Sequence, residues 1–450
     1  MDRGADTVFT GVCTDSRQDC SGAVFFALRG DNTDGHLYVA HAERGGAVAA
    51  VVERPVQGVQ LPLLTVPDAL TALGELARYH LKRFELPRIA VTGSVGKTSV
   101  RAMTAWALAG RHRVCESERN HNNEIGVPMT VFRIGPEHTA AVIEMAMRGM
   151  GQLAYLADIV RPSIAIITNI GLSHIELLGT RERIAEAKAE VLAALPADGV
   201  AILPKHDQFS GYLMGRCPCR VLTFGLEAEA DFDASQPQLG IDGVTRFTVN
   251  GVPFEVRSPG VHHAVNAAAT CAAASALKIS VDEVADRFRS FSPPDMRMVV
   301  REAPGCVTIL DDTYNAAPDS VLAALASLKQ FAAQGNRRAV AILADMKELG
   351  EHSAEAHRMI GNSHEMGNIA LLITVGQQSA LIADAASQRK SGRPERVERY
   401  TDAPAAVEPI VKLIEPGDVV VVKGSRAMGM ERIVAALIER DTDHRVPRSE

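Results

Sequence analysis

A short glycine-containing loop near position 95 carries the clearest chemical signal in this sequence. Gly93-Ser-Val-Gly96-Lys97-Thr98 follows an apolar run and opens a stretch with helical spacing. Glycines let a backbone wrap around a phosphate, and free amides at a helix start attract an anion. The lysine of such a loop reaches the terminal phosphates of a nucleotide, and the next hydroxyl can bind Mg²⁺. The pattern predicts a nucleotide site made of Gly93, Ser94, Val95, Gly96, Lys97, Thr98 and Ser99.

The spacing of this loop differs from that of the common P-loop, because two residues rather than four separate its glycines. A glycine loop that precedes a helix by chance is the alternative interpretation. The position between a strand and a helix favours the nucleotide site.

A nucleotide site needs a carboxylate for its metal, and Glu144 is the candidate. Glu144 ends the apolar run 140–143, and His174 follows the run 164–168. The carboxyl ends of parallel strands line the ligand crevice of an α/β sheet, so both side chains are expected there. A surface glutamate and a structural histidine remain the alternatives. Lys188 lies in a helical stretch, where a lysine is normally solvated surface.

Polar clusters in the loops are candidates for substrate binding. The segment 120–126 is a polar loop of the kind that positions ligands. The segments 311–315 and 423–426 each follow a predicted strand in the last third of the chain and point into a second crevice. Arg426 could bind a carboxylate through two parallel hydrogen bonds, although a surface arginine is an equal alternative.

Strands that alternate with helices are expected to position these residues. Pro87 and the segment 292–294 mark boundaries between domains. The predicted fold class is α/β, with a small N-terminal α/β domain at 1–84 and a central P-loop ATPase-like domain with a parallel sheet at 85–292. A C-terminal Rossmann-like domain is expected at 293–450. Asp242-Gly243 and Asn250-Gly251 predict hairpin turns within the central domain.

Composition excludes several functional classes. The 450 residues are 46% hydrophobic and carry a net charge of −7, which argues against a nucleic-acid partner. No apolar run is long enough to span a membrane, and the N-terminus lacks an apolar signal core. A cytoplasmic location is therefore expected. The seven scattered cysteines lack a zinc-binding pattern, and free thiols are the expected state.

Taken together, these segments resemble the Mur ligase family over nearly the whole chain. The matching motifs are the glycine loop, 122–128, 144–151 and 168–179, together with 13–17, 25–30 and 34–36 near the N-terminus. The resemblance implies that Lys188 is carbamylated and binds Mg²⁺ with Thr98, Glu144 and His174. Lys97, Lys188, His174 and Glu144 would be the catalytic residues.

The resemblance also implies binding roles for residues outside the glycine loop. Asn266 is expected near the adenine, and Arg297 and Asp312 are expected to close onto the nucleotide from the third domain. The expected substrate-binding residues are Asp15, Ser16, Arg17, Asn123, Asn315 and Arg426. Four positions depart from the family pattern, and none of them is an expected phosphate or metal ligand; they are Ala146, Gln152, His263 and Ala317.

Motifs of the last domain narrow the expected activity. The segments 311–320, 345–350 and 423–431 resemble the family members that add D-alanyl-D-alanine, and the Asp-Asn-Pro-Arg stretch typical of members that add a diamino acid is absent. The resemblance implies an ATP- and Mg²⁺-dependent amide ligase that joins D-alanyl-D-alanine to UDP-N-acetylmuramoyl-tripeptide through an acyl phosphate. It would act as a monomer in peptidoglycan synthesis, and thus in cell shape and division.

Three alternatives remain at this point. A related ligase could use another amine donor, such as a diamino acid or glutamate. A P-loop kinase or other NTPase would need no amine. A non-catalytic module would bind ATP without turnover.

Overall fold

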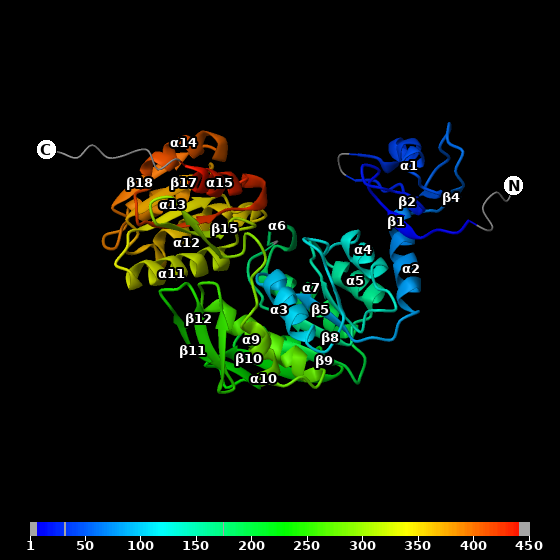
Figure 1. Ribbon diagram of the computed structural model, residues 1–450, viewed down its shortest axis with the longest axis horizontal. Helices are drawn as coiled ribbons and strands as arrows, with labels where there is room; N and C mark the ends of the chain where they lie inside the picture. The colour runs from blue at the N-terminus through cyan, green and yellow to red at the C-terminus, as the bar shows by residue number, and fades with distance from the viewer. Residues whose placement is uncertain (1–6, 31–32, 174, 441–450) are drawn as a thin grey trace.

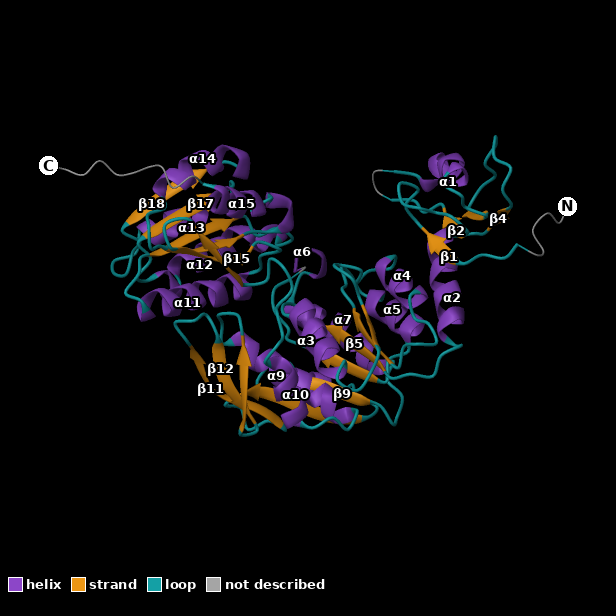
Figure 2. Ribbon diagram, viewed as in Figure 1, coloured by secondary structure: helices purple, strands orange, loops and turns teal. Residues whose placement is uncertain are grey.

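Three β-sheets, each formed by one continuous part of the chain, organise this protein. The computed structural model describes residues 7–30, 33–173 and 175–440. The first and third sheets lie on opposite sides of the second, so that the three units form an open arc (Figure 1). Each sheet is flanked by helices (Figure 2). The α/β fold class predicted from the sequence is confirmed.

The first sheet is small and entirely parallel, with the strand order β1-β2-β3-β4. Its elements are β1 (Gly11–Cys13), β2 (Ala23–Phe26), α1 (Val39–Arg44), β3 (Ala49–Val52), β4 (Leu63–Thr65) and α2 (Ala69–Leu81). Asp68 caps α2, since its Oδ1 accepts a hydrogen bond from the backbone N–H of Thr71 at 2.6 Å. Helix α2 packs on helices of the next unit as well as on β2.

The second sheet has the order β13-β12-β11-β10-β9-β8-β5-β7-β6. Its strands are parallel except for β12, which is antiparallel to both of its neighbours, β11 and β13. Its strands are β5 (Arg88–Thr92), β6 (Val114–Glu116), β7 (Ala140–Glu144), β8 (Ile164–Ile167), β9 (Val200–Pro204), β10 (Arg220–Leu226), β11 (Phe232–Leu239), β12 (Thr245–Val249) and β13 (Val252–Val256). Its helices are α3 (Lys97–Leu108), α4 (Gly126–Phe132), α5 (Gln152–Val160), α6 (Ile175–Leu178), α7 (Arg181–Ala193), α8 (Ser210–Met214), α9 (His262–Ala276) and α10 (Val281–Phe288). Both predicted hairpin turns are present.

Both faces of this sheet are buried. Ile89 and Val91 of β5 belong to the core under α3 and α9, whereas Ala90 belongs to the core under α5 and α7. Alternate residues of one strand point to opposite faces, so an apolar strand with two cores must be covered on both sides. The covering helices leave only the strand ends open to ligands.

The third sheet has the order β14-β15-β19-β16-β17-β18 and is parallel except for its edge strand β14. Its strands are β14 (Val299–Ala303), β15 (Val307–Asp312), β16 (Ala339–Ala344), β17 (Leu371–Val375), β18 (Arg396–Tyr400) and β19 (Val419–Lys423). Its helices are α11 (Pro318–Gln334), α12 (Ser353–Asn362), α13 (Ala380–Ser387), α14 (Ala403–Leu413) and α15 (Glu431–Glu439). Strands β15, β19 and β16 are neighbours, so the loops that follow them emerge side by side.

The expectation that every cysteine is a free thiol is wrong. Cys13, at the end of β1, and Cys20, just before β2, form a disulfide, and their Cα atoms lie 5.8 Å apart. The parallel pairing of β1 with β2 brings the two ends of the connecting loop together, which the spacing of the cysteines did not indicate. The other five cysteines carry free thiols. Within the described residues, no helix combines the length and the apolar character needed to cross a membrane.

Candidate active site

One cavity of about 780 Å³ collects most of the residues predicted to form the site. Its wall combines loops from the second sheet with loops from the third sheet. The expected residues on this wall are Ser94, Val95, Gly96, Lys97, Thr98, Ser99, Asn123, Glu144, Asn266, Arg297, Asp312, Asn315 and Arg426. Gly93 directly precedes this set, at the end of β5.

The glycine loop is held against the loop that follows β8. The Thr168 hydroxyl donates to the Val95 carbonyl at 2.6 Å, and the Asn169 side-chain oxygen accepts from the Val95 N–H at 3.0 Å. A Cβ at Gly93 would lie 1.8 Å from the Thr168 hydroxyl oxygen, so only glycine fits there. Gly96 has a φ of 82°, a left-handed value that glycine adopts readily, and it begins α3. The first amides of α3 have no partner within the helix and suit a phosphate.

Lys97 lies at the centre of this loop. Its ammonium donates to the carbonyls of Gly93 at 2.9 Å and of Ser94 at 3.1 Å. Burial lowers the pKa of Lys97, and the nearby carboxylate of Glu144 partly offsets that effect. The side chain thus forms part of the loop and is positioned to reach a phosphate bound there.

Glu144 is a buried carboxylate rather than a surface glutamate, since only 2% of the residue is exposed. Its Oε1 accepts a hydrogen bond from Asn122 Nδ2 at 2.7 Å, and its Oε2 lies 3.7 Å from Arg101 Nε. Among the described residues, Oε2 has no hydrogen-bond partner. A buried carboxylate oxygen without a donor fits a cation at this edge of the sheet.

Lys188 is also buried rather than solvated, with 1% of the residue exposed. Burial, reinforced by the positive charge of Lys97, holds the pKa of Lys188 well below its ordinary value. No hydrogen bond from its ammonium to another described residue is present. Lys188 does not line the cavity but lies within electrostatic range of the glycine loop.

Only some of the four expected Mg²⁺ ligands can be placed at the cavity. Thr98 and Glu144 both face the cavity. His174 lies outside the described residues. The described part of the chain holds no cluster of three or more His, Cys, Asp and Glu side chains.

Arg297 connects the two halves of the cavity. Its Nη2 donates to the Thr98 hydroxyl at 3.2 Å, and its guanidinium carbon lies 4.1 Å from the centre of the Tyr314 ring. The cation–π contact keeps the guanidinium near the third sheet while the hydrogen bond reaches the glycine loop. A cation so placed can offset the charge of a bound nucleotide.

Lys423 begins the predicted segment 423–426, but the sequence assigned it no role of its own. Its ammonium lies 2.5 Å from Asp312 Oδ2 and donates to the Asn315 carbonyl at 2.9 Å. The side chain is buried at the end of β19, next to the end of β15. Because its two partners belong to the expected site, Lys423 positions them. Asn122 and Arg101 contact Glu144. Asn122 lies in the predicted polar loop 120–126, whereas Arg101 was missed, although it lies one helical turn after Lys97, at a spacing that places both on one face of α3.

His263, one of the four departures, links the two units behind the cavity. The Ser258 hydroxyl donates to the Met298 carbonyl at 2.8 Å, so His263 Nε2, 2.8 Å away, must donate to Ser258. Burial lowers the pKa of His263 far below its ordinary value, which keeps the ring neutral. The substitution therefore leaves the cavity wall unchanged and supports the connection to the third sheet.

Asp15, Ser16 and Arg17 are not brought to this cavity. They lie in the first unit, where Arg17 Nη2 bonds Asp15 Oδ2 at 2.7 Å. Figure 1 places this unit on the side of the central sheet away from the third unit. Any ligand that bridges both sites must therefore be long.

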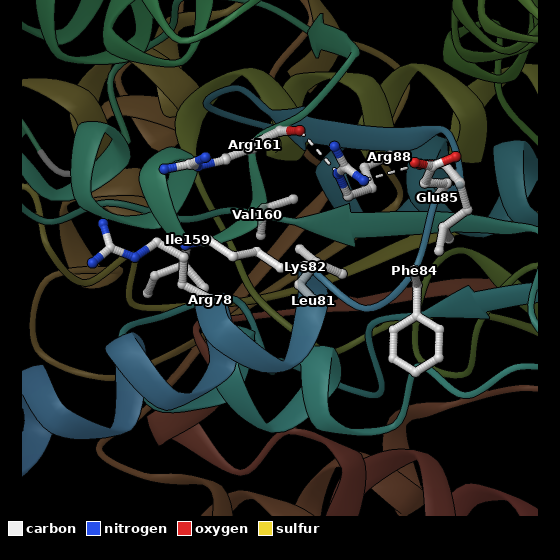
Figure 3. A pocket seen from close by; sticks show the side chains of 10 residues that line it. Arg78, Leu81, Lys82, Phe84, Glu85, Arg88, Ile159, Val160 and Arg161 are labelled. Atoms are coloured by element: carbon white, nitrogen blue, oxygen red, sulfur yellow. Dashed lines mark hydrogen bonds between the residues drawn. The ribbon is translucent and has the colours of Figure 1, made fainter.

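A second, smaller cavity of about 390 Å³ lies at the junction of the first two units and contains none of the expected residues (Figure 3). There Arg88 Nε donates to the Arg161 carbonyl at 2.9 Å, and Arg88 Nη1 donates to the Leu86 carbonyl at 3.2 Å. These bonds fix the connection between α2 and β5, so a structural role accounts for Arg88.

Comparison with protein families gives three matches. Residues 8–80 match the model of the Mur ligase family, catalytic domain. Residues 91–274 match the Mur ligase middle domain, and residues 296–426 match the Mur ligase, glutamate ligase domain.

Individual relatives match over nearly their whole length. A UDP-N-acetylmuramoyl-tripeptide–D-alanyl-D-alanine ligase of Synechocystis sp. is 35% identical, over 96% of this chain and 93% of that protein. The crystal structure of MurF from Acinetobacter baumannii is 30% identical with a TM-score of 0.85, over 96% of this chain and 93% of that one. The structure of MurF ligase from Thermotoga maritima in complex with ADP is 27% identical with a TM-score of 0.84, over 97% of this chain and 99% of that one.

Proposed function

The chain belongs to the Mur ligase family, and from this membership we propose that it joins D-alanyl-D-alanine to UDP-N-acetylmuramoyl-tripeptide. It is an ATP-dependent ligase. The observation that carries the proposal is the single cavity that combines a phosphate-binding loop with polar loops of the third sheet. Relatives that match this chain almost from end to end carry the name of this activity.

The reaction has two steps. The terminal carboxylate of the tripeptide attacks the γ-phosphate of ATP, which forms an acyl phosphate and releases ADP. Lys97 and the amides of the glycine loop offset the charge that spreads over the transferred phosphoryl group. The amine of D-alanyl-D-alanine then attacks the acyl carbon and expels inorganic phosphate. The enzyme contributes mainly position and charge, because neither step needs a covalent enzyme intermediate.

Thr98, Glu144, His174 and a carbamate on Lys188 would hold Mg²⁺. The bound metal would neutralise phosphate charge. The buried position and lowered pKa of Lys188 support the carbamate, since only a neutral amine reacts with carbon dioxide. The product carbamate supplies the oxygen ligands that Mg²⁺ prefers.

The first unit would bind the UDP end of the acceptor through Asp15, Ser16 and Arg17. Asn266 would contact the adenine, and Asn123 the peptide. The third unit would carry the donor and exclude water from the acyl phosphate, which water hydrolyses. Action as a monomer in the cytoplasm is part of this proposal.

Replacement of Arg426 tests the donor site. Arg426 lies on the cavity wall, and its Nη1 also bonds Glu431 Oε2 at 3.1 Å. Loss of a charge-assisted hydrogen bond to the donor carboxylate costs roughly 1.5–3 kcal/mol. Arg426→Ala should therefore raise the KM for D-alanyl-D-alanine about ten- to a hundredfold, with little change in the KM for ATP. Steady-state kinetics with each substrate varied in turn will measure this.

The matched controls separate the donor site from general effects. Arg432→Ala removes an exposed arginine six residues away and should leave both constants unchanged. Arg426→Lys should rescue only part of the loss, because an ammonium cannot form two parallel bonds. Equal changes in the KM for D-alanyl-D-alanine and the KM for ATP would assign Arg426 to closure of the cavity instead.

Identification of the product tests the proposed function itself. The protein is incubated with ATP, Mg²⁺, UDP-N-acetylmuramoyl-tripeptide and D-alanyl-D-alanine, and the nucleotide-linked products are weighed by mass spectrometry. A UDP-linked pentapeptide is expected, with one ADP formed for each. Formation of ADP with no new peptide would indicate an NTPase.

A further inference from the structure

Two neighbouring loops of the third unit present opposite charges to the cavity. Strands β16 and β19 pair in parallel, with Leu343 opposite Lys423. The loop after β16 carries Glu348, and the loop after β19 carries Arg426; both residues lie on the cavity wall. The carboxyl ends of paired parallel strands meet at one edge, so these loops emerge together.

Hydrogen bonds fix the two loops to each other. The backbone N–H of Lys347 donates to the Ser425 hydroxyl at 2.8 Å. The backbone N–H of Ser425 donates to the Asp345 carbonyl at 3.2 Å. Glu348 directly follows Lys347, and Arg426 directly follows Ser425. The two charged residues therefore lie next to the contact that joins the loops, on one surface of the cavity.

A free dipeptide carries charges that match this surface. Near pH 7 its carboxylate is ionised and most of its amine is protonated, since an α-amino group has a pKa of about 8. Arg426 suits the carboxylate. The ammonium needs an anionic partner close to the acyl carbon, because it must lose a proton before the nitrogen can attack.

Four carboxylates line the cavity: Glu144, Asp312, Asp319 and Glu348. Glu144 accepts a hydrogen bond from Asn122 and is a metal ligand in the proposed function. Asp312 forms an ion pair with Lys423. Asp319 lies beside Gly171, where a Cβ would approach its Oδ2 to 2.5 Å. Glu348 differs from these three because it lies on the loop after β16, which is hydrogen-bonded to the loop that carries Arg426.

The loop of Glu348 also reaches the centre of the reaction. Burial lowers the pKa of Lys97, and the charge of Glu348, like that of Glu144, partly offsets this effect. Gly350 lies against Glu176 of α6, which brings the loop to the central unit. Glu348 itself has a φ of 65°, a backbone conformation that L residues seldom adopt, so the surrounding fold must hold it there.

We propose that Glu348 binds the ammonium of the donor and accepts its proton as the amine attacks the acyl phosphate. This inference rests on the proposed function. The nitrogen forms a bond to the acyl carbon, the bond from that carbon to the phosphate oxygen breaks, and inorganic phosphate leaves with its electron pair. Two protons leave the nitrogen: the Glu348 carboxylate takes the first, which frees the lone pair for attack, and passes it to water, and the departing phosphate takes the second.

A donor that is already neutral provides the sharpest test. Hydroxylamine is largely unprotonated at pH 7 and converts an acyl phosphate to a hydroxamate. With ATP and UDP-N-acetylmuramoyl-tripeptide, Glu348→Gln and the wild type should form hydroxamate at similar rates. Ligation of D-alanyl-D-alanine by the variant should fall about a hundredfold at pH 7, which is the lower end of the rate loss that removal of a general base causes.

The pH dependence provides an independent readout. For the wild type, kcat/KM for the dipeptide should change little between about pH 6 and 8, because the carboxylate accepts the proton. The variant depends on free amine, so its kcat/KM should rise about tenfold per pH unit below the amine pKa of about 8. Glu348→Asp, which keeps a carboxylate, should recover part of the rate at pH 7.

Glu351→Gln is the matched control, since Glu351 lies three residues away with its side chain 87% exposed and off the cavity wall. It should match the wild type in both reactions. Ligation by Glu348→Gln within threefold of the wild type across this pH range would overturn the proposal. The proposal would also be overturned if Glu348→Gln lost hydroxamate formation as much as ligation. A loss of ligation but not of hydroxamate formation in Asp319→Asn, with none in Glu348→Gln, would overturn it too. Failure of the wild type to form hydroxamate would overturn the proposed function, and this inference with it.

Discussion

Replacing Lys97 with alanine should slow ADP formation by about a hundred- to a thousandfold while the protein stays folded. Loss of one positioned donor to the charge that develops in a transition state has this effect. Among the described residues, the Lys97 ammonium donates to carbonyls of its own loop, so its removal should leave the buried cores intact. Single-turnover ADP formation measures the loss, and thermal unfolding followed by circular dichroism checks the fold.

Lys412→Ala is a suitable control for that variant. Lys412 is exposed on α14 and pairs with Glu408 one turn away. It should have wild-type activity. Near-normal ligation by Lys97→Ala would contradict the assignment of the glycine loop to the phosphates.

Replacing Lys188 with alanine should reduce ligation about a hundredfold, and formate or acetate should restore part of the activity. The alanine variant lacks the proposed carbamate oxygens, and the space left by the buried side chain can admit a small carboxylate. Initial rates with and without added carboxylate, at constant ionic strength, measure both effects.

The rescue must be specific to this residue. Lys97→Ala should gain nothing from added carboxylate, because a second anion cannot replace a cation beside the phosphates. A Lys188→Ala variant as active as the wild type would show that no carbamate is needed. Inactivity unchanged by any carboxylate would point to a role for the ammonium itself.

Local features of the fold followed closely from the sequence. The apolar runs before Gly93 and Glu144 are strands, and the stretch with helical spacing that follows the glycine loop is helix α3. These elements depend on apolar periodicity and on glycine and capping residues, which are properties of short segments. The resemblance to a family then assigned roles that no short segment could indicate.

Lys188 illustrates that difference. On a helix, a lysine is usually solvated, and its own segment gave no reason to expect burial. Its place in α7 beneath the glycine loop depends on packing between that helix and the sheet. Only the family resemblance indicated a role, and the buried position is consistent with it.

The contacts of the third unit could not be predicted, because they depend on strand order. Asp312 ends β15, Lys423 ends β19 and Glu348 follows β16. These three strands are separated along the chain but adjacent in the sheet. The pairing of Lys423 with Asp312, and the hydrogen bond of the Lys347 N–H to Ser425, both follow from that order. The disulfide between Cys13 and Cys20 likewise depends on the pairing of β1 with β2.

The most direct test of the account is phosphate release with UDP-N-acetylmuramoyl-tripeptide and ATP, measured over a set of amine donors. The set comprises D-alanyl-D-alanine, L-alanyl-L-alanine, D-alanine, lysine, diaminopimelate, glutamate and no donor. The account predicts rapid release with D-alanyl-D-alanine and at most slow release with each of the others. Preference for a single diamino acid or for glutamate, or release at the same rate without any amine, would contradict it.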